Sequence, residues 1–164
     1  MNANAQSMPF DPEALGRKYQ EERDKRLRAD GNDQYQEVSG EFAYFVEDPY
    51  IDSELKRDAI EDEVEVVIIG GGFGGMLAAA RLHDAGLTDF RIIEKGGDFG
   101  GTWYWNRYPG ASCDIESYVY FPLLEKTGFV PKHKYTNAPE TLEYCHVIAK
   151  TYGLHERALM QTMV

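Results

Sequence analysis

The residues whose types and spacing could support chemistry begin with a glycine-rich turn, Gly70 to Gly75, and a single acid, Glu94. Between a strand and a helix, Gly70 permits a sharp bend, Gly72 lets the backbone approach a pyrophosphate, and Gly75 lets the helix sit on the strand. The helix N-terminus adds unpaired N–H groups and a partial positive charge. The pattern predicts a site for the phosphates of a dinucleotide.

Glu94 follows Gly75 by nineteen residues and comes directly after the next apolar run. A carboxylate at this place is expected to accept hydrogen bonds from both hydroxyls of a ribose, and it repels a 2′-phosphate. FAD or NAD is therefore favoured over NADP at this site. The neighbouring residues Phe73, Gly74 and Lys95 belong to the same predicted cofactor-binding set.

A second group of candidates, Gly100 to Gly110, combines a diglycine with an aromatic cluster. The diglycine gives another place where the backbone can lie against a flat or charged ligand. The aromatic side chains suit an isoalloxazine ring, which needs a dry and π-rich wall. The alternative is a hydrophobic plug that closes the end of the sheet. Composition does not decide between a flavin-binding wall and such a plug. The predicted binding residues here are Gly101, Thr102, Trp103, Tyr104 and Trp105.

Two strands and a helix must position these residues. The apolar run 64–69 predicts a buried parallel strand, because its hydrophobic character is continuous. Residues 73–84 predict a helix that Gly86 ends, and residues 90–93 predict a second strand. These three elements form a βαβ unit with a right-handed crossover.

After this unit the sequence predicts a long loop over residues 95–114, which is rich in glycine and aromatic residues. Loops of this length are usually functional or disordered, and the aromatic content argues against disorder. Residues 139–152 predict a helix with one apolar face, which contains Leu142 and Ile148. Residues 159–164 predict the start of a further strand.

The N-terminal part of the chain is acidic. Residues 1–63 carry 17 acidic and 8 basic side chains, so they account for −9 of the chain's net charge of −11. After a polar leader over residues 1–10, Asp11 and the following proline begin a predicted helix that runs to about Arg28. Short helices are expected between residues 40 and 62, with Asp52 opening the second. This extension is either a partly ordered acidic arm without a function of its own or a partner-binding segment.

Charge and composition exclude several classes of protein. Nucleic acid is a poor partner for an acidic chain. No apolar run is long enough to span a membrane, and no signal-peptide pattern is found. Two cysteines, Cys113 and Cys145, make no disulfide framework and suit a reducing compartment, so a cytoplasmic location is expected. The scattered histidines predict no metal site.

The stretch from Gly100 to Ser117, GGTWYWNRYPGASCDIES, resembles the flavin loop of the type I Baeyer–Villiger monooxygenases. The resemblance covers residues 64–164. Related flavin-containing and N-hydroxylating monooxygenases share the glycine turn but not the W-Y-W-N-R-Y-P-G continuation. The long acidic extension is similar to that of the subgroup acting on bulky, aromatic or polycyclic ketones.

The resemblance implies a role for each matching residue. Gly70, Gly72, Gly74 and Gly75 fall on the turn for the FAD pyrophosphate, Glu94 on its ribose acid, and residues 102–105 on the flavin side. Tyr120 matches a tyrosine that hydrogen-bonds the cofactor, and Asp114 an active-site aspartate that pairs with a catalytic arginine. Ser112 and Cys113 lie where NADPH comes close. Each has a simpler alternative: Asp114 could cap a turn, Tyr120 could be a strand aromatic, and Cys113 a small buried spacer.

The fold class expected is therefore α/β, a Rossmann-like FAD-binding βαβ unit with a parallel sheet, preceded by a mostly helical acidic extension. The predicted division is residues 1–62 for the extension and 63–164 for the first part of the FAD-binding domain. Such enzymes use NADPH and O₂ to convert ketones to esters or lactones. The second glycine turn and the F-x-G-x-x-x-H-x-x-x-W fingerprint of the family are missing from this sequence. The chain alone is thus expected to be inactive and to need the remainder of the polypeptide. The alternative is a stand-alone module that binds FAD or its ADP half, or serves only for interaction.

Overall fold

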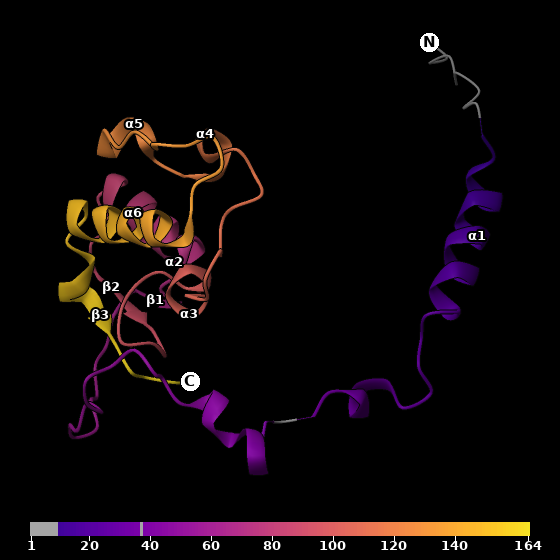
Figure 1. Ribbon diagram of the computed structural model, residues 1–164, viewed down its shortest axis with the longest axis horizontal. Coiled ribbons are helices and arrows are strands. Elements are labelled where there is room, and N and C mark those ends of the chain that lie inside the picture. The colour runs from indigo at the N-terminus through magenta and orange to yellow at the C-terminus, as the bar shows by residue number, and fades with distance from the viewer. Residues whose placement is uncertain (1–9, 37) are drawn as a thin grey trace. The chain divides into compact units, whose positions relative to one another are not determined.

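The computed structural model describes residues 10–36 and 38–164, so most of the predicted polar leader lies outside the described residues. Contacts divide the chain into two compact units, Met1–Glu47 and Asp48–Val164 (Figure 1). Residues 48–62, which the sequence-based division assigns to the extension, thus make their contacts within the unit that contains the sheet. The division at residue 62 itself stays a prediction.

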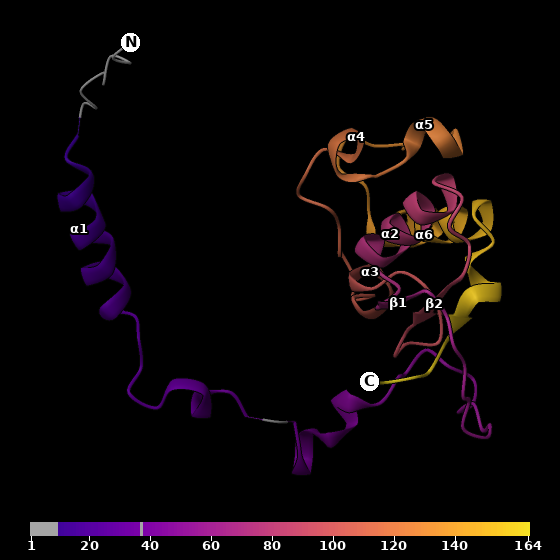
Figure 2. The ribbon, with the colours of Figure 1, turned by 180° about the vertical axis from the view of Figure 1, so that it is seen from behind.

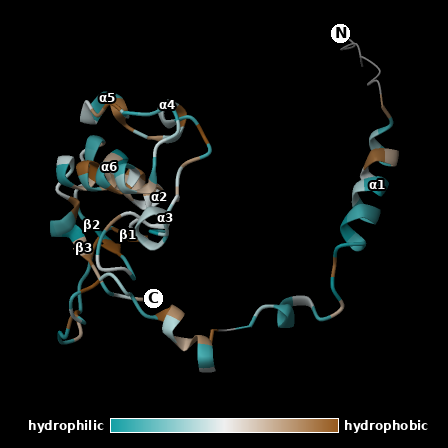
Figure 3. Cartoon of the chain, viewed as in Figure 1, coloured by the Kyte–Doolittle hydropathy of each residue, from teal (hydrophilic) through white to brown (hydrophobic). Residues whose placement is uncertain are grey.

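The first unit contains the helix α1, Pro12–Asp24, and the 3₁₀ helices η1, Gly31–Gln34, and η2, Gly40–Val46. The start of α1 is as predicted, because the Asp11 side chain accepts a hydrogen bond of 2.9 Å from the Glu13 N–H. The helix ends one turn before the predicted Arg28. It buries no residue, so no packing holds its last turn. Figure 3 shows that most of α1 is hydrophilic.

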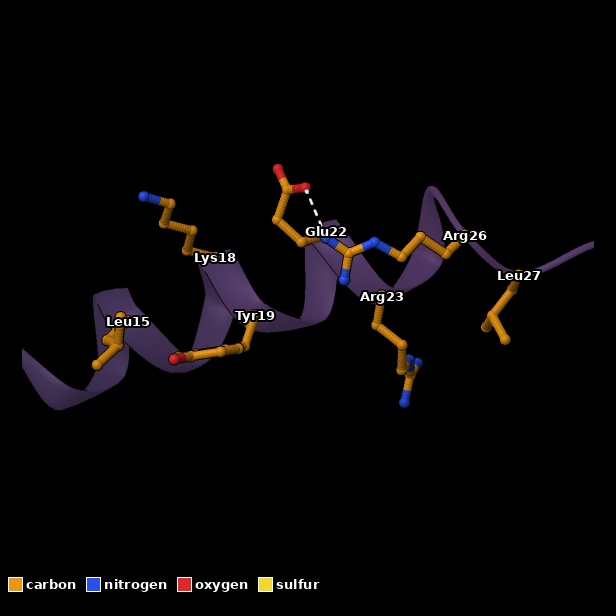
Figure 4. A pocket seen from close by; sticks show the side chains of 7 residues that line it. All are labelled: Leu15, Lys18, Tyr19, Glu22, Arg23, Arg26 and Leu27. Atoms are coloured by element: carbon orange, nitrogen blue, oxygen red, sulfur yellow. Dashed lines mark ion pairs between the residues drawn. The ribbon is translucent and has the colours of Figure 1, made fainter. Parts of the chain in front are cut away.

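One face of α1 carries the apolar side chains Leu15 and Tyr19 beside charged ones, and Leu27 follows just after the helix (Figure 4). Tyr19 is 71% exposed, and the ion pair on this face joins Arg26 to Glu22 at 3.9 Å. None of the predicted cofactor-binding residues lies here. Nothing in the described part of the chain shows what covers this face.

The second unit is built around a parallel sheet of three strands in the order β1-β2-β3. The strands are β1, Val66–Ile69, β2, Phe90–Ile93, and β3, Ala158–Leu159. In the register, Val66 lies opposite Phe90 and Ile92 lies opposite Ala158. The predicted parallel sheet is confirmed, and the bounds of β2 are as expected.

The prediction that β1 is a buried strand from Val64 onward is wrong in two respects. The strand begins two residues later, and its side chains alternate between half-buried and exposed. Ile68 points toward α2, whereas Val67 is 55% and Ile69 is 70% exposed. The helices α2 and α6 lie on the same side of the sheet (Figure 1 and Figure 2), so the described residues bury one face of this strand.

The core lies between the sheet and two helices, α2, Phe73–Asp84, and α6, Ala138–Thr151. The bounds of α2 are as predicted, and Ala79 and Ala80 are fully buried, which permits close packing. Gly86 ends the helix with φ +85°. The start and end of α6 each lie one residue earlier than predicted. Its predicted apolar face is confirmed, because Cys145, Ile148 and Ala149 are buried and Leu142 packs against the core.

Residues 51–64 contain no helix, so the predicted short helix beginning at Asp52 is wrong. This segment is rich in charged residues and has too few apolar ones to form a buried helical face. It makes side-chain contacts with the end of the chain instead. The Leu55 N–H donates to Gln161 Oε1 at 2.7 Å, and the Arg57 guanidinium donates to Thr162 Oγ1 at 2.6 Å.

Two loop predictions also need correction. The loop 95–114 contains one helical turn, α3, Thr102–Trp105, and Tyr120 lies in the helical turn α4, Ser117–Tyr120, rather than in a strand. The last predicted strand is limited to the two residues of β3, because Gln161 adopts φ +50° and interrupts the extended backbone. The short elements α5, Leu124–Thr127, and η3, Leu154–Arg157, complete the unit.

Candidate functional site

The glycine turn lies at the carboxyl end of β1, directly before α2. Gly70 has φ +98°, and its N–H donates to the Ile93 carbonyl at 2.8 Å, which fixes the turn against β2. A Cβ built at Gly75 would lie 1.9 Å from Gly70 O. The third glycine therefore permits α2 to start against the turn, as the sequence predicts. This is the geometry in which a helix N-terminus faces a ligand at the sheet edge.

Glu94 is 5% exposed and lies beside the glycine turn. One of its carboxylate oxygens accepts a hydrogen bond from the Gly71 N–H, and the other accepts one of 2.6 Å from the Gly96 N–H. A Cβ at Gly71 would lie 2.9 Å from Glu94 Oε2, so only glycine fits here without displacement. Two backbone donors thus compensate the burial of this charge.

The glycine turn and the Gly100–Gly101 pair meet backbone to backbone. The Gly100 N–H donates to the Gly71 carbonyl at 3.0 Å. A Cβ at Gly101 would lie 2.7 Å from the Gly72 Cα, and Gly101 has φ +53°. The second loop is therefore held directly against the first at its glycines, and α3 begins at that contact.

The structure brings three predicted aromatic side chains together beside the start of α2. Trp103, which is 8% exposed, donates its indole N–H to the Tyr120 hydroxyl at 3.0 Å. The Phe73 and Tyr120 rings meet edge to face with 5.5 Å between centroids. Burial raises the pKa of Tyr120, so its hydroxyl stays protonated at neutral pH. These side chains form an aromatic wall next to the glycine turn.

The other predicted residues of this loop point elsewhere. Tyr104 is 2% exposed, and its hydroxyl donates to Asp48 Oδ2 at 2.7 Å. Lys95 lies over the Trp105 ring, 5.8 Å from its centroid. Thr102 is exposed at the first position of α3. Thus Trp103 and Tyr120 contribute to the aromatic wall, whereas Tyr104, Trp105 and Lys95 do not.

Asp114 lies next to this wall, at a cavity of about 310 Å³ that Trp103 and Tyr120 also line. Its side chain is exposed, and its carboxylate makes no hydrogen bond to the residues that the structure describes. The capping alternative therefore gains no support, and the pairing with an arginine stays a prediction. Cys113 is 4% exposed, which agrees with a buried spacer, whereas Ser112 is exposed.

His155 hydrogen-bonds the second loop at Asp98, and His146 lies close to the same carboxylate. His155 Nε2 lies 2.8 Å from Asp98 Oδ1, and His146 Nε2 lies 3.3 Å from Asp98 Oδ2. One carboxylate in the loop thus faces a ring from η3 and a ring from α6. No local sequence pattern indicates either contact. Within residues 10–36 and 38–164, no group of three or more His, Cys, Asp or Glu side chains is arranged for a metal ion.

Sequence reasoning also missed two residues of the site and one that holds the neighbouring loop. Gly71 and Gly96 donate their N–H groups to Glu94. Both glycines lie beside residues that the sequence does predict, so their position could have indicated them. Asp48 contacts Tyr104 from 56 positions away, and no local pattern marks it. Burial raises the pKa of the Cys145 thiol to about 12, so this side chain is an inert core residue. No helix in the described ranges is long and apolar enough to cross a bilayer.

Known proteins are similar to this chain in sequence and in fold. The family model of an NAD(P)-binding Rossmann-like domain matches residues 68–128, which include the glycine turn and Glu94. A Baeyer–Villiger monooxygenase of Stachybotrys chlorohalonatus is 50% identical over 162 residues, which are 98% of this chain and 26% of that protein.

Two solved structures have a similar fold. The polycyclic ketone monooxygenase of the thermophilic fungus Thermothelomyces thermophila is 41% identical with a TM-score of 0.72, over 91% of this chain and 25% of that one. The crystal structure of OTEMO in complex with FAD and NADP is 32% identical with a TM-score of 0.58, over 64% and 20%. The chain spans about a quarter of the length of the curated relatives it matches. With this identity across nearly all of its length and the same fold, the chain belongs to the Baeyer–Villiger monooxygenase family.

Proposed function

We propose that this chain binds FAD at the carboxyl ends of β1 and β2 and forms the FAD-binding part of a flavin monooxygenase. The observation that carries the proposal is the buried Glu94 carboxylate, held by backbone N–H groups beside a glycine turn at a helix N-terminus. The complete enzyme would act in the cytoplasm, use NADPH and O₂, and convert a ketone to an ester or lactone. Similarity to a polycyclic ketone monooxygenase supports a bulky ketone.

The residues of the turn fit the ADP half of FAD. A Cβ at Gly70 or Gly74 would meet nothing within 4 Å, so there is open space beside the turn. The first N–H groups of α2 have no partner within the helix and suit the pyrophosphate. A carboxylate has about four acceptor positions, and the Gly71 and Gly96 N–H groups occupy two of them on Glu94. Each carboxylate oxygen therefore keeps a position for a ribose hydroxyl.

The aromatic wall fits the flavin half. Trp103 and Tyr120, joined by their hydrogen bond, present rings beside the turn, where a planar cofactor needs a dry surface. FAD supplies the redox chemistry when bound, and the residues of this chain hold and orient it. Asp114 at the neighbouring cavity would pair with a catalytic arginine of the complete enzyme.

Replacing Glu94 with alanine tests the cofactor assignment. The variant should bind FAD about 1–3 kcal/mol more weakly, because charge-assisted hydrogen bonds to the ribose are lost. Titration with FAD, followed by quenching of flavin fluorescence, measures the affinity. Circular dichroism confirms that the variant is folded, since Glu94 also binds the Gly71 and Gly96 N–H groups.

The matched control is Glu143→Ala, which removes an exposed carboxylate from α6 and should leave the FAD affinity unchanged. Equal affinity of the Glu94 variant and the original chain would place the ribose elsewhere. A parallel titration with ADP distinguishes an FAD site from a module for the ADP half alone. Such a module would bind ADP but not FAD.

A further inference from the structure

A short segment that precedes the βαβ unit lies against the loop that carries α3. It comprises residues 48–51 and is called the docking segment here. Ile51 packs on Gly97 so closely that a Cβ there would lie 2.4 Å from Ile51 Cγ2. Asp48 and Ile51 are both partly buried, in a part of the chain where most side chains are exposed. The docking segment is thus fixed to the loop by specific contacts.

The Asp48 carboxylate is the centre of these contacts. Its Oδ2 atom accepts two hydrogen bonds, one of 2.7 Å from the Tyr104 hydroxyl and one of 2.9 Å from the Gly97 N–H. Its Oδ1 atom accepts a bond of 2.9 Å from the Tyr50 N–H. Burial and the hydrogen bond to Asp48 raise the pKa of Tyr104 to about 12, so the hydroxyl remains a donor. Bonds to an ionised acceptor are stronger than those between neutral groups.

A second set of contacts joins the docking segment to the same tyrosine. The Arg107 guanidinium lies 4.0 Å from the Tyr50 ring centroid and 4.6 Å from that of Tyr104. Its Nε–H donates to the Tyr104 carbonyl at 2.9 Å. The two tyrosine rings meet edge to face with 5.6 Å between centroids, and the Tyr50 hydroxyl donates to the Trp105 carbonyl at 3.3 Å. Both the side chain and the backbone of Tyr104 are therefore fixed.

These contacts matter because α3 is a single turn of four residues, Thr102–Trp105. A helix of one turn has no intrinsic stability, so its orientation depends on tertiary contacts. Trp103 and Tyr104 are consecutive residues and point to different partners: Trp103 to Tyr120 in the aromatic wall and Tyr104 to Asp48. The position of the Trp103 ring is thus set from both sides of the turn.

We propose that Asp48 is a positioning residue for the cofactor site: by holding Tyr104 and Gly97, it fixes α3 so that Trp103 presents its ring to the flavin side. Asp48 acts through α3 and touches neither the glycine turn nor Glu94 in the contacts of its carboxylate. The statement about flavin rests on the proposed function. The role of Asp48 in fixing α3 is independent of that function, because it depends only on contacts within the protein.

The first experiment measures α3 without a cofactor. Asp48→Asn in the full 164-residue chain removes the charge and weakens the bonds to Tyr104 and Gly97. Amide hydrogen exchange across residues 97–107 should become about tenfold faster, the effect of losing one charge-assisted bond. Acrylamide quenching of the two tryptophans, both in α3, should increase. Asp52→Asn, which removes a neighbouring exposed carboxylate, should change neither signal.

The second experiment compares FAD with ADP. Asp48→Asn should weaken FAD binding about tenfold and leave the ADP affinity within about twofold, because ADP has no flavin that would face Trp103. A merely structural role would lower both affinities together. Tyr104→Phe removes the partner hydroxyl and keeps the ring, and it should reproduce the faster exchange and the selective loss of FAD affinity.

Several results would overturn the proposal. Unchanged exchange across residues 97–107 in both Asp48→Asn and Tyr104→Phe would show that α3 does not depend on Asp48. An equal loss of FAD and ADP affinity would make Asp48 a general stability residue. If Asp48→Asn fails to fold, Tyr104→Phe decides both points. Failure of the original chain to bind either FAD or ADP would contradict the proposed function, while the exchange experiment would still test the role of Asp48.

Discussion

Replacing Gly75 with alanine is expected to lower the free energy of unfolding of the α/β unit by about 3 kcal/mol or more. The new Cβ would lie 1.9 Å from the Gly70 carbonyl oxygen and 3.0 Å from its carbon, and both are backbone atoms that cannot rotate away. The start of α2 would have to move off the turn, which would disturb its packing on Ile68. Chemical denaturation followed by circular dichroism measures the change.

Gly74→Ala is the matched control, because it introduces the same methyl group one residue earlier in the same helix. A Cβ at Gly74 meets nothing within 4 Å. Alanine is favoured over glycine in helices, so this variant should unfold with the same free energy or one up to about 1 kcal/mol higher. Two variants of equal stability would show that α2 does not start against Gly70 as described.

The parts of the fold that could be predicted from the sequence are those that local patterns determine. The bounds of α2 and β2 follow from apolar runs, a glycine turn and the glycine that ends the helix. The start of α1 follows from the Asp11 side chain, which caps the helix in the structure. In each case the determining contact lies within a few residues along the chain, so spacing alone indicates it.

The errors concern features that depend on distant packing. The continuous apolar run before Gly70 indicated burial on both faces, but the burial of Val67 and Ile69 depends on what lies against the outer face of the sheet. The strand expected over residues 159–164 stops because Gln161 takes a positive φ, which a non-glycine residue seldom adopts and no local pattern indicates. The segment after Asp52, which lacks a helix, instead bonds residues about a hundred positions away, and no local pattern indicates that contact.

In the candidate site, too, local spacing predicts some residues, whereas others depend on distant contacts. The glycine turn and Glu94 were found because their spacing encodes a known geometry of backbone and carboxylate. The contact of Gly101 with Gly72 was not predicted, since the sequence shows both glycine-rich stretches but not that they touch. Asp48 is one of 17 acids in the first 63 residues, and composition does not distinguish the one that binds Tyr104.

Replacing Gly101 with alanine is expected to separate the two glycine loops and to weaken FAD binding by about 3 kcal/mol, which equals about a 100-fold loss of affinity. The Cβ would lie 2.7 Å from the Gly72 Cα, and φ +53° is unfavourable for alanine. Because Gly101 directly precedes α3, the turn that carries Trp103 would move with it. FAD titration and tryptophan emission measure the two effects, since Trp103 and Trp105 are the only tryptophans of the chain.

Gly128→Ala tests the effect of a positive φ without a clash, at a ψ of 11° where Gly101 has −119°. Gly128 has φ +68°, close to that of Gly101, but a Cβ there meets nothing within 4 Å. This variant should cost about 1 kcal/mol of stability from the positive φ alone and leave the tryptophan emission and the FAD affinity unchanged. If both variants altered FAD affinity equally, the backbone contact between Gly101 and Gly72 would not be what holds α3 at the glycine turn. A selective effect of Gly101→Ala would instead show that the cofactor site depends on two glycine loops in contact, with α3 positioned by that contact on one side and by Asp48 on the other.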